Sequence, residues 1–259
     1  MILFALLAIT ASDPVLSKVG SGEVDWTRGV LRTEVSVVAN TDAWEGTRAT
    51  EMEARHQLEA RFFAIAGRLP VSAKLTASNV MSRFPAVGRQ MKAGLKDGVG
   101  DWHVAETRYY QSGRVVLVGE LDLLDWLKPY AIEVASQKGS ASLDMGTFSG
   151  VLVDARHLAV KPSYAPRFLG PASVVVYDLS HFSQRTVIST MPVLWVSDAA
   201  AEQVAERVGD NPLMLVAKSV AGKRDLRFSA VDAMELRELS ATSAPHQRLP
   251  IVIVVSDGK

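Results

Sequence analysis

Residues 43–69 read AWEGTRATEMEARHQLEARFFAIAGRL, and this stretch predicts a helix of roughly six turns. Its apolar side chains recur at intervals of three and four residues and form one stripe: Ala54, Leu58, Phe62, Ile65 and Leu69. The other face is charged, and Gly67 followed by Pro70 marks the end of the helix. Because such a helix is stabilised mainly by burial of its stripe, the flanking segments must supply a cover.

The segments around this helix predict a mainly antiparallel sheet. Four stretches have the alternating or β-rich pattern of strands, with short turns between neighbours: Val24–Arg28, Val30–Val38, Trp102–Tyr109 and Arg114–Leu121. Helical periodicity returns at 77–96, which Pro85 should kink or split, and again at 122–137. We therefore expect the helices at 43–69 and 77–96 to pack on one face of this sheet.

A second set of elements follows a small, polar, glycine-containing stretch at 138–147. The expected elements are strands at 148–153, 172–177, 191–196, 213–220 and 225–228, with helices beginning after Asp198 and Ser229. The last strand, Ile251–Val255, is apolar on both faces, which is typical of an interior strand. The sequence thus predicts an α+β fold with domains at 20–137 and 148–259. Each is expected to be a mainly antiparallel sheet with helices packed on one face.

Composition excludes several classes of function. The 259 residues contain 28 Lys and Arg and 28 Asp and Glu, so no net charge attracts nucleic acid or an anionic membrane. Cysteine is absent, which excludes disulfides, thiolate metal sites, cysteine nucleophiles and a cysteine-borne lipid anchor. We expect neither a cofactor nor a nucleic-acid partner.

The N-terminus carries an apolar run, ILFALLAI at residues 2–9, that is too short to span a bilayer. Its length and the small residues after it are typical of an export signal, which predicts a signal peptide at residues 1–13. No Lys or Arg precedes the run, so a hydrophobic first strand or a late-assigned start remains the alternative. With the signal removed, we expect an exported or periplasmic protein without an integral membrane segment.

Asp154, His157, Asp178 and His181 are the residue types of a metal site or an acid–base pair. Their spacing follows no metal-binding signature, so surface or hydrogen-bonded polar groups are the favoured interpretation. Ser149 could complete a triad with Asp154 and His157, but FSGVL lacks the glycine pattern of a nucleophile elbow. We therefore predict no catalytic, cofactor-binding or metal-binding residue.

Two stretches carry a family resemblance: GSGEVDWTRGVLRTEV at residues 20–35 and TRATEMEARHQLEARFFAIAGRLPV at residues 47–71. Together they resemble the LPP20 family of bacterial envelope proteins, which includes the N-terminal domain of the flagellar T-ring protein FlgT. The second half is similar to the C-terminal part of longer relatives through GVLVDARHL, YAPRFL, VGDNPLMLVAKSVAG and IVIVV. The chain has no lipobox cysteine.

This resemblance implies a non-enzymatic structural or assembly protein of the periplasm or outer membrane, flagellar in some members. Its expected partners are envelope proteins or further copies of itself. The alternative is a hydrolase or small-ligand-binding protein with a site in the second domain near Asp154, His157 and His181. An enzyme should gather these three side chains around a pocket, whereas an assembly protein should leave them apart and expose apolar surface instead.

Overall fold

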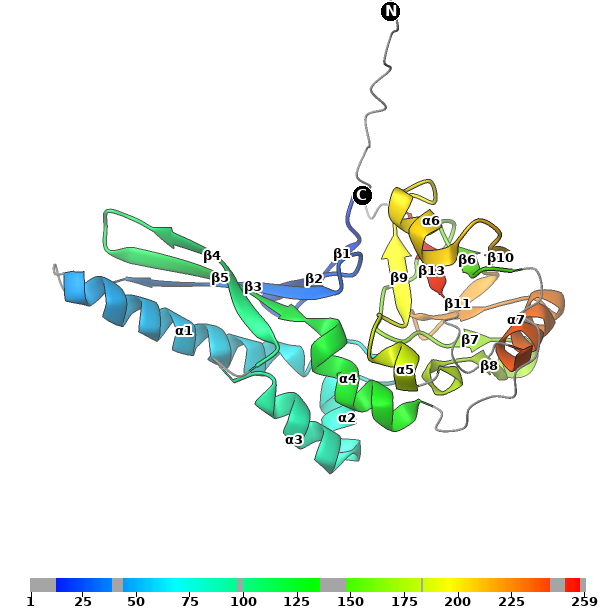
Figure 1. Ribbon diagram of the computed structural model, residues 1–259, viewed down its shortest axis with the longest axis horizontal. Coiled ribbons are helices and arrows are strands. Elements are labelled where there is room, and N and C mark those ends of the chain that lie inside the picture. The colour runs from blue at the N-terminus through cyan, green and yellow to red at the C-terminus, as the bar shows by residue number, and fades with distance from the viewer. Residues whose placement is uncertain are drawn as a thin grey trace, which may run out of the picture.

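The helix expected at 43–69 is α1 (Trp44–Ala66), and it lies along a five-stranded antiparallel sheet (Figure 1). The computed structural model describes residues 13–38, 44–96, 100–135, 148–182, 184–242 and 250–256. We call 13–135 the first lobe and 148–256 the second lobe. The first sheet has the spatial order β1 (Leu16–Val19), β2 (Gly22–Asp25), β3 (Val30–Val38), β5 (Arg114–Asp122), β4 (Trp102–Tyr109).

The apolar stripe of α1 is buried against β3 and β5, as the sequence predicts. Leu58 and Phe62 are fully buried, and β5 has a glycine, Gly119, directly beneath them. A Cβ at this position would lie 2.8 Å from the Leu58 Cδ2 and Phe62 Cε2 atoms. The missing side chain is therefore what lets the helix approach the sheet.

The opposite face of this sheet carries ion pairs. The guanidinium of Arg108 lies 2.6 Å from Glu34, and that of Arg32 lies 3.4 Å from Glu106. These side chains are about two-fifths to one-half exposed, so each pair contributes at most ~1 kcal/mol. One face of the first sheet is thus covered by a helix and the other by charged side chains.

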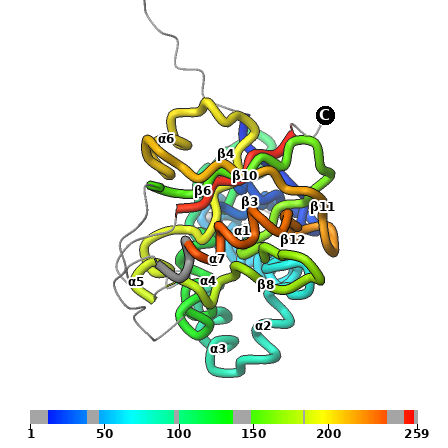
Figure 2. Tube along the Cα trace, turned by 90° about the vertical axis from the view of Figure 1, so that its right-hand side faces the viewer, coloured from blue at the N-terminus to red at the C-terminus, as the bar shows by residue number. Residues whose placement is uncertain are grey.

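The region expected as a helix at 77–96 is split into α2 (Ala77–Arg83) and α3 (Pro85–Ala93). Pro85 occupies the first turn of α3, where its fixed φ is compatible with a helix, and forces Phe84 out of the helical conformation. Figures 1 and 2 show both helices below the sheets, where α3 packs on α4 (Leu123–Val134). They lie below the C-terminal end of α1, whereas the sequence predicts that they pack with α1 on one face of the sheet.

The main sheet of the second lobe is parallel, which corrects the prediction of a mainly antiparallel one. Its order is β10 (Leu213–Val216), β6 (Val151–Asp154), β13 (Ile251–Val254), β9 (Val193–Val196), and every neighbouring pair is parallel. The interior position of β13 is as predicted. A strand that is apolar on both faces is the pattern of a buried parallel sheet, and connections longer than a hairpin join these strands.

A second, mixed sheet completes this lobe, in the order β11 (Ser219–Ala221), β12 (Asp225–Arg227), β7 (Phe168–Leu169), β8 (Val175–Tyr177). The single strand expected at 213–220 is therefore two strands in different sheets. The other elements are helices α5 (Gln184–Val187), α6 (Glu202–Val208) and α7 (Ala230–Thr242), and 3-10 turns η1 (Pro171–Ser173) and η2 (Leu179–His181). Both lobes combine helices with sheets, so the predicted α+β class is confirmed.

One hydrophobic cluster runs through both lobes. The loop after α1 joins them by backbone hydrogen bonds, because Tyr164 and Ala165 donate to the carbonyl oxygens of Pro70 and Val71. The lobes are therefore packed as one body. Residues 1–12 of the expected signal peptide and the expected linker at 138–147 lie outside the described residues. Across the described part of the chain, every helix is too short or too polar to cross a bilayer.

Candidate binding site between the lobes

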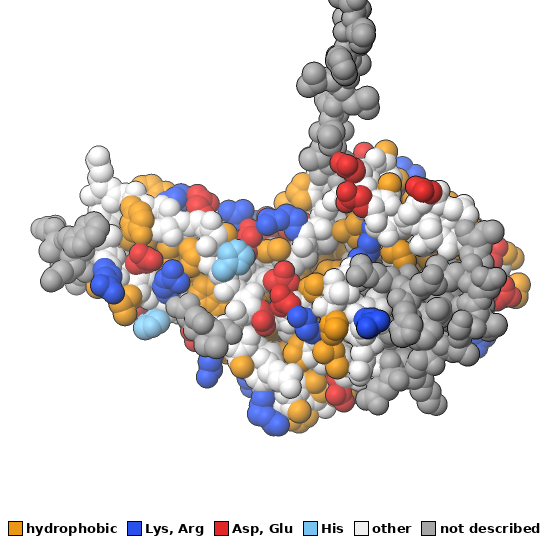
Figure 3. Space-filling model, viewed as in Figure 1, with side chains coloured by type: hydrophobic (Ala, Val, Ile, Leu, Met, Phe, Trp, Pro, Cys, Tyr) orange, Lys and Arg blue, Asp and Glu red, His pale blue; other side chains and the backbone are white. Residues whose placement is uncertain are grey.

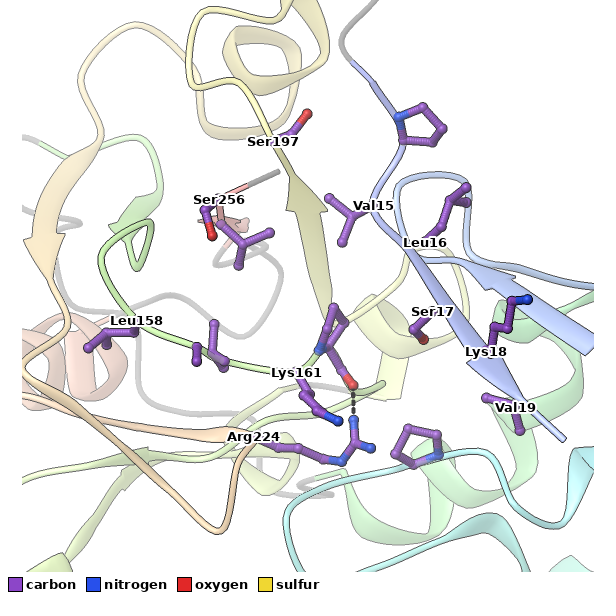
Figure 4. Close-up of a pocket in the computed structure, with 16 residues that line it drawn as sticks. Val15, Leu16, Ser17, Lys18, Val19, Leu158, Lys161, Ser197, Arg224 and Ser256 are labelled. Atoms are coloured by element: carbon purple, nitrogen blue, oxygen red, sulfur yellow. Dashed lines mark hydrogen bonds between the residues drawn. The ribbon is translucent and has the colours of Figure 1, made fainter. Parts of the chain in front are cut away.

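A cleft of about 760 Å³ lies between the two lobes (Figure 4). One wall is β1 with the residues just before it, and the other is formed by loops of the second lobe. The lining residues are Pro14, Val15, Leu16, Ser17, Lys18, Val19, Pro70, Leu158, Ala159, Val160, Lys161, Pro162, Ser197, Arg224, Val255 and Ser256. The volume is within the ~300–1,000 Å³ that is usual for small-molecule sites.

The second-lobe wall is formed at the carboxyl ends of the parallel strands. The pairing register aligns Val254 of β13 with Asp154 of β6 and with Val196 of β9, so the three strands end at one level. The loops that follow them supply residues 158–162, Ser197 and 255–256 to the cleft. In open sheets with parallel strands, ligands bind in the crevice outside these ends.

The first-lobe wall is set by the alternation of side chains along β1. Leu16 and Lys18 are exposed, whereas Ser17 and Val19 lie on the inner side of the strand. The Ser17 Oγ accepts a 2.7 Å hydrogen bond from the Trp26 indole N–H. The backbone of Val15 is also held, because its N–H donates to the Thr27 Oγ at 2.9 Å. These two hydrogen bonds tie the first-lobe wall to the turn after β2.

The charged side chains that line the cleft are all basic: Lys18, Lys161 and Arg224. Arg224 is the last residue of the tight turn between β11 and β12, in which Gly222 and Lys223 both have positive φ. The Lys161 N–H donates to the Lys223 carbonyl oxygen at 2.8 Å, which ties the loop after β6 to this turn. The fold therefore brings Lys161 and Arg224 together from segments about sixty residues apart in sequence.

The Arg224 guanidinium donates to the carbonyl oxygen of Pro162, as Figure 4 shows. It has no carboxylate partner among the described residues. The neighbouring carboxylate, Asp225, is fully buried and already accepts hydrogen bonds from the Arg167 guanidinium at 2.8 and 2.5 Å. Burial lowers the pKa of Arg224, because no nearby negative charge offsets its lost hydration.

Asp154 and His157 lie at the carboxyl end of β6, next to the cleft but outside its lining. The Asp154 carboxylate accepts hydrogen bonds from the Arg156 guanidinium at 2.6 and 3.0 Å and from the Arg156 N–H at 3.0 Å. The side-chain hydrogen bond from Arg156 lowers the pKa of Asp154 to about 2. The Asp154 carboxylate is therefore ionised and holds the start of the loop after β6 through Arg156.

Asp178 and His181 form a separate local pair around η2, with 3.1 Å between Oδ1 and Nδ1. Asp178 also accepts from the Ser180 N–H at 2.9 Å, so it caps the turn. Burial opposes ionisation of Asp178, yet the hydrogen bonds from His181 and Ser180 lower its pKa to about 2. The same contact raises the pKa of His181.

Ser149 is a structural group. Its Oγ donates to the Val208 carbonyl oxygen at 2.6 Å and accepts from the Asn211 N–H at 3.0 Å, which fastens the turn after α6 to the start of β6. Across the residues that the structure describes, His, Asp and Glu side chains do not gather in threes around a space for a metal ion. The candidate residues Asp154, His157, Asp178 and His181 thus divide into two local groups.

Sequence reasoning missed Lys161 and Arg224 as site residues. Neither lies in a motif, and each became notable only when the fold placed it beside the cleft. The one available signal was IVIVV at 251–255, because a buried parallel strand implies a crevice at its carboxyl end.

Comparison with known proteins concerns the second lobe. Residues 150–257 match the family model described as Treponema pallidum Tp0624, second domain. The matched range contains β6 to β13 and begins close to the boundary that the sequence predicts at 148. A search of the curated proteins finds no match.

Proposed function

We propose that the protein is a non-enzymatic structural or assembly protein of the bacterial cell envelope that acts by binding other proteins or copies of itself. The LPP20-like stretches at 20–35 and 47–71 support this proposal, as does the export-like run at residues 2–9. Both stretches belong to the first lobe, where they form β2, β3 and α1.

The observation that carries the proposal is the shape of the first lobe. We call α1 together with β3, β4 and β5 the arm, because these elements extend away from the second lobe (Figure 1). Met52 is in the outer half of α1, and Phe63 is in its last turn, at the base of the arm. Figure 3 shows hydrophobic side chains scattered among charged ones on this arm. Four large apolar side chains of the arm are between 41% and 62% exposed: Val38, Met52, Phe63 and Tyr109.

The exposed apolar residues of α1 lie on the side opposite the buried stripe. Met52 and Phe63 are about three turns apart, so they point in nearly the same direction. Contiguous exposed apolar surface marks protein contact sites, and Met52 and Phe63 are the side chains that α1 would contribute to such a surface. Because the sheet already buries the other side of α1, the arm can present Met52 and Phe63 without losing its own packing.

A photo-cross-linking experiment tests this proposal. A benzoylphenylalanine residue replaces Phe63 or Met52 in the arm, and the matched control replaces Met234 of α7, which is similarly exposed in the second lobe. We expect discrete adducts from the arm positions in an envelope fraction, identified by mass spectrometry as one envelope protein or a second copy. Equal or absent cross-linking at the arm and control positions would contradict the proposal.

The compartment needs its own measurement. We propose export with removal of about the first 11–13 residues, because the apolar run is followed by small residues. Mass spectrometry of the native protein should find an N-terminus between Ser12 and Pro14 without a lipid adduct. An intact Met1 in a cytoplasmic fraction would contradict export.

Ligand binding is the second candidate function, and the cleft between the lobes favours it. The cleft is close to Asp154 and His157, but its lining comes from the following loop and from the first lobe. We therefore place the ligand-binding site at the junction of the lobes and not at Asp154, His157 and His181, where the sequence suggested it. The two candidates are compatible, since the arm and the cleft are different parts of the molecule.

A further inference from the structure

We propose that the cleft between the lobes binds an amphiphilic anion, a carboxylate or phosphate attached to an apolar body. This inference gives a chemistry to the ligand-binding candidate, on which it rests, and it does not depend on the assembly function of the arm. The anionic group lies against Arg224 and Lys161, and the apolar body lies between β1 and the loop after β6.

The state of Arg224 is the first argument. Two arginines in this region meet opposite conditions. Arg167 is paired with the buried carboxylate of Asp225, whereas Arg224, within the described part of the chain, contacts a carbonyl oxygen and no carboxylate. A partly desolvated cation without a counter-ion is unfavourable, and an anion that reaches it replaces the lost hydration. Guanidinium also presents a planar set of donors that matches carboxylate and phosphate oxygens.

Lys161 strengthens the positive field at the same place. Both side chains line the cleft, and Figure 4 draws Lys161 beside Arg224. The hydrogen bond from the Lys161 N–H to the Lys223 carbonyl oxygen holds the two segments in this arrangement. Since the described lining contains no acidic side chain, the cleft attracts anions and repels cations.

The rest of the lining is mostly apolar. Val15 and Val19 come from the first lobe, and Leu158, Val160 and Val255 come from the second. An inorganic anion would leave this surface in contact with water, whereas an attached alkyl or aryl group would cover it and bind through the hydrophobic effect. The volume of about 760 Å³ leaves room for such a body.

Isothermal titration calorimetry of the full chain tests the inference with four probes. Octanoate and octyl phosphate carry both parts of the proposed ligand, octanol carries only the apolar part, and inorganic phosphate carries only the charge. We expect octanoate or octyl phosphate to bind more tightly than octanol and than inorganic phosphate. The order of the first two distinguishes a carboxylate from a phosphate source.

Three variants locate the binding. Arg224→Gln removes the charge but keeps a donor for Pro162, and Lys161→Gln is a second variant in case the first does not fold. Each should weaken binding of the preferred anion by about ten-fold or more, the usual effect of losing a charge-assisted hydrogen bond. Arg156→Gln, on the same loop but paired with Asp154, should leave it unchanged.

Several results would overturn the inference. Failure of both amphiphilic anions to saturate at millimolar concentration would do so, as would equal binding of octanol. Binding that persists unchanged in folded Arg224→Gln and Lys161→Gln proteins would place the anion elsewhere. None of these outcomes bears on cross-linking at the arm, so the two proposals fail separately.

Discussion

The sheets of the two lobes differ in how many of their faces are covered by other parts of the protein. The first sheet is antiparallel and needs cover on only one face, which α1 supplies, while ion pairs such as Arg108–Glu34 lie on the other. The main sheet of the second lobe is parallel, and its central strands β6 and β13 are buried on both faces, by the common core and by α6. An antiparallel sheet can leave one face in contact with water, so the first lobe can extend into solvent. A parallel sheet is usually covered on both faces, so the second lobe is globular.

This difference also separates the two candidate functions. The projecting lobe provides an arm with exposed apolar side chains, and the buried parallel strands provide a crevice at their carboxyl ends. The cleft exists only where β1 of the first lobe faces that crevice. Substitutions that destabilise one lobe, or only the junction between them, therefore test whether the two lobes unfold together.

The largest effect is expected from Leu58→Asp in the first lobe. Leu58 is fully buried between α1 and the first sheet, so the new carboxylate would be desolvated without a partner. Its cost should be comparable with the entire stability of a domain, roughly 5–15 kcal/mol. Urea denaturation checks this, and a soluble Leu58→Asp protein that unfolds cooperatively would disprove the placement of α1.

Ile253→Asp is the matched change in the second lobe, because Ile253 is fully buried in the central strand β13. One hydrophobic cluster includes both Leu58 and Ile253, so either change should destabilise both lobes. Hydrogen exchange resolved by mass spectrometry measures each lobe. Loss of protection confined to the mutated lobe would show that the lobes are independent.

A smaller effect is expected from breaking the junction with Asp225→Ala. The Asp225 carboxylate also accepts a 3.3 Å hydrogen bond from the Ala73 N–H of the first lobe. Its removal leaves the Arg167 guanidinium unpaired in a mostly buried position and should cost about 3–5 kcal/mol in the free energy of unfolding. Asp154→Ala, which breaks the exposed pair with Arg156, is the control and should cost at most ~1 kcal/mol. Equal losses in the two variants would contradict a structural role for the junction.

Gly119→Ala tests the contact between α1 and the sheet more gently. The added methyl group would meet Leu58 and Phe62 at 2.8 Å, so the helix must shift or the side chains must change rotamer. Overpacking of this kind typically costs about 1–3 kcal/mol. Thermal denaturation gives the change, and an unaltered midpoint would mean that α1 sits further from β5.

The smallest effect concerns pH. His181 has a pKa raised above 6.5 by Asp178, so its stabilisation is complete below the unfolded pKa and is lost as the pH rises through the folded value. The pair is about one-third exposed, so we expect at most ~1 kcal/mol. His181→Gln should remove the decline in stability above pH 6.5, measured by urea denaturation at several pH values. A variant that keeps the same decline would place its source in another group.

The sequence alone determined most of the local structure of the first lobe, although β1 was not among the expected strands. The stripe from Ala54 to Leu69 predicts both α1 and its buried face, Pro85 predicts the break between α2 and α3, and the hairpin strands pair as expected. These predictions succeed because short-range periodicity, turn residues and neighbouring strands set them. The α+β class follows from the same signals.

Only the tertiary structure decided the sheet of the second lobe and the cleft. IVIVV predicts a buried interior strand, but strand direction depends on partners such as β6 and β9, which are 55 residues or more away in the chain. Lys161 and Arg224 meet for the same reason, since a turn and a loop from separate segments are tied together there. Local patterns specify which residues are buried, whereas long-range pairing specifies which buried segments become neighbours and therefore where a site can form.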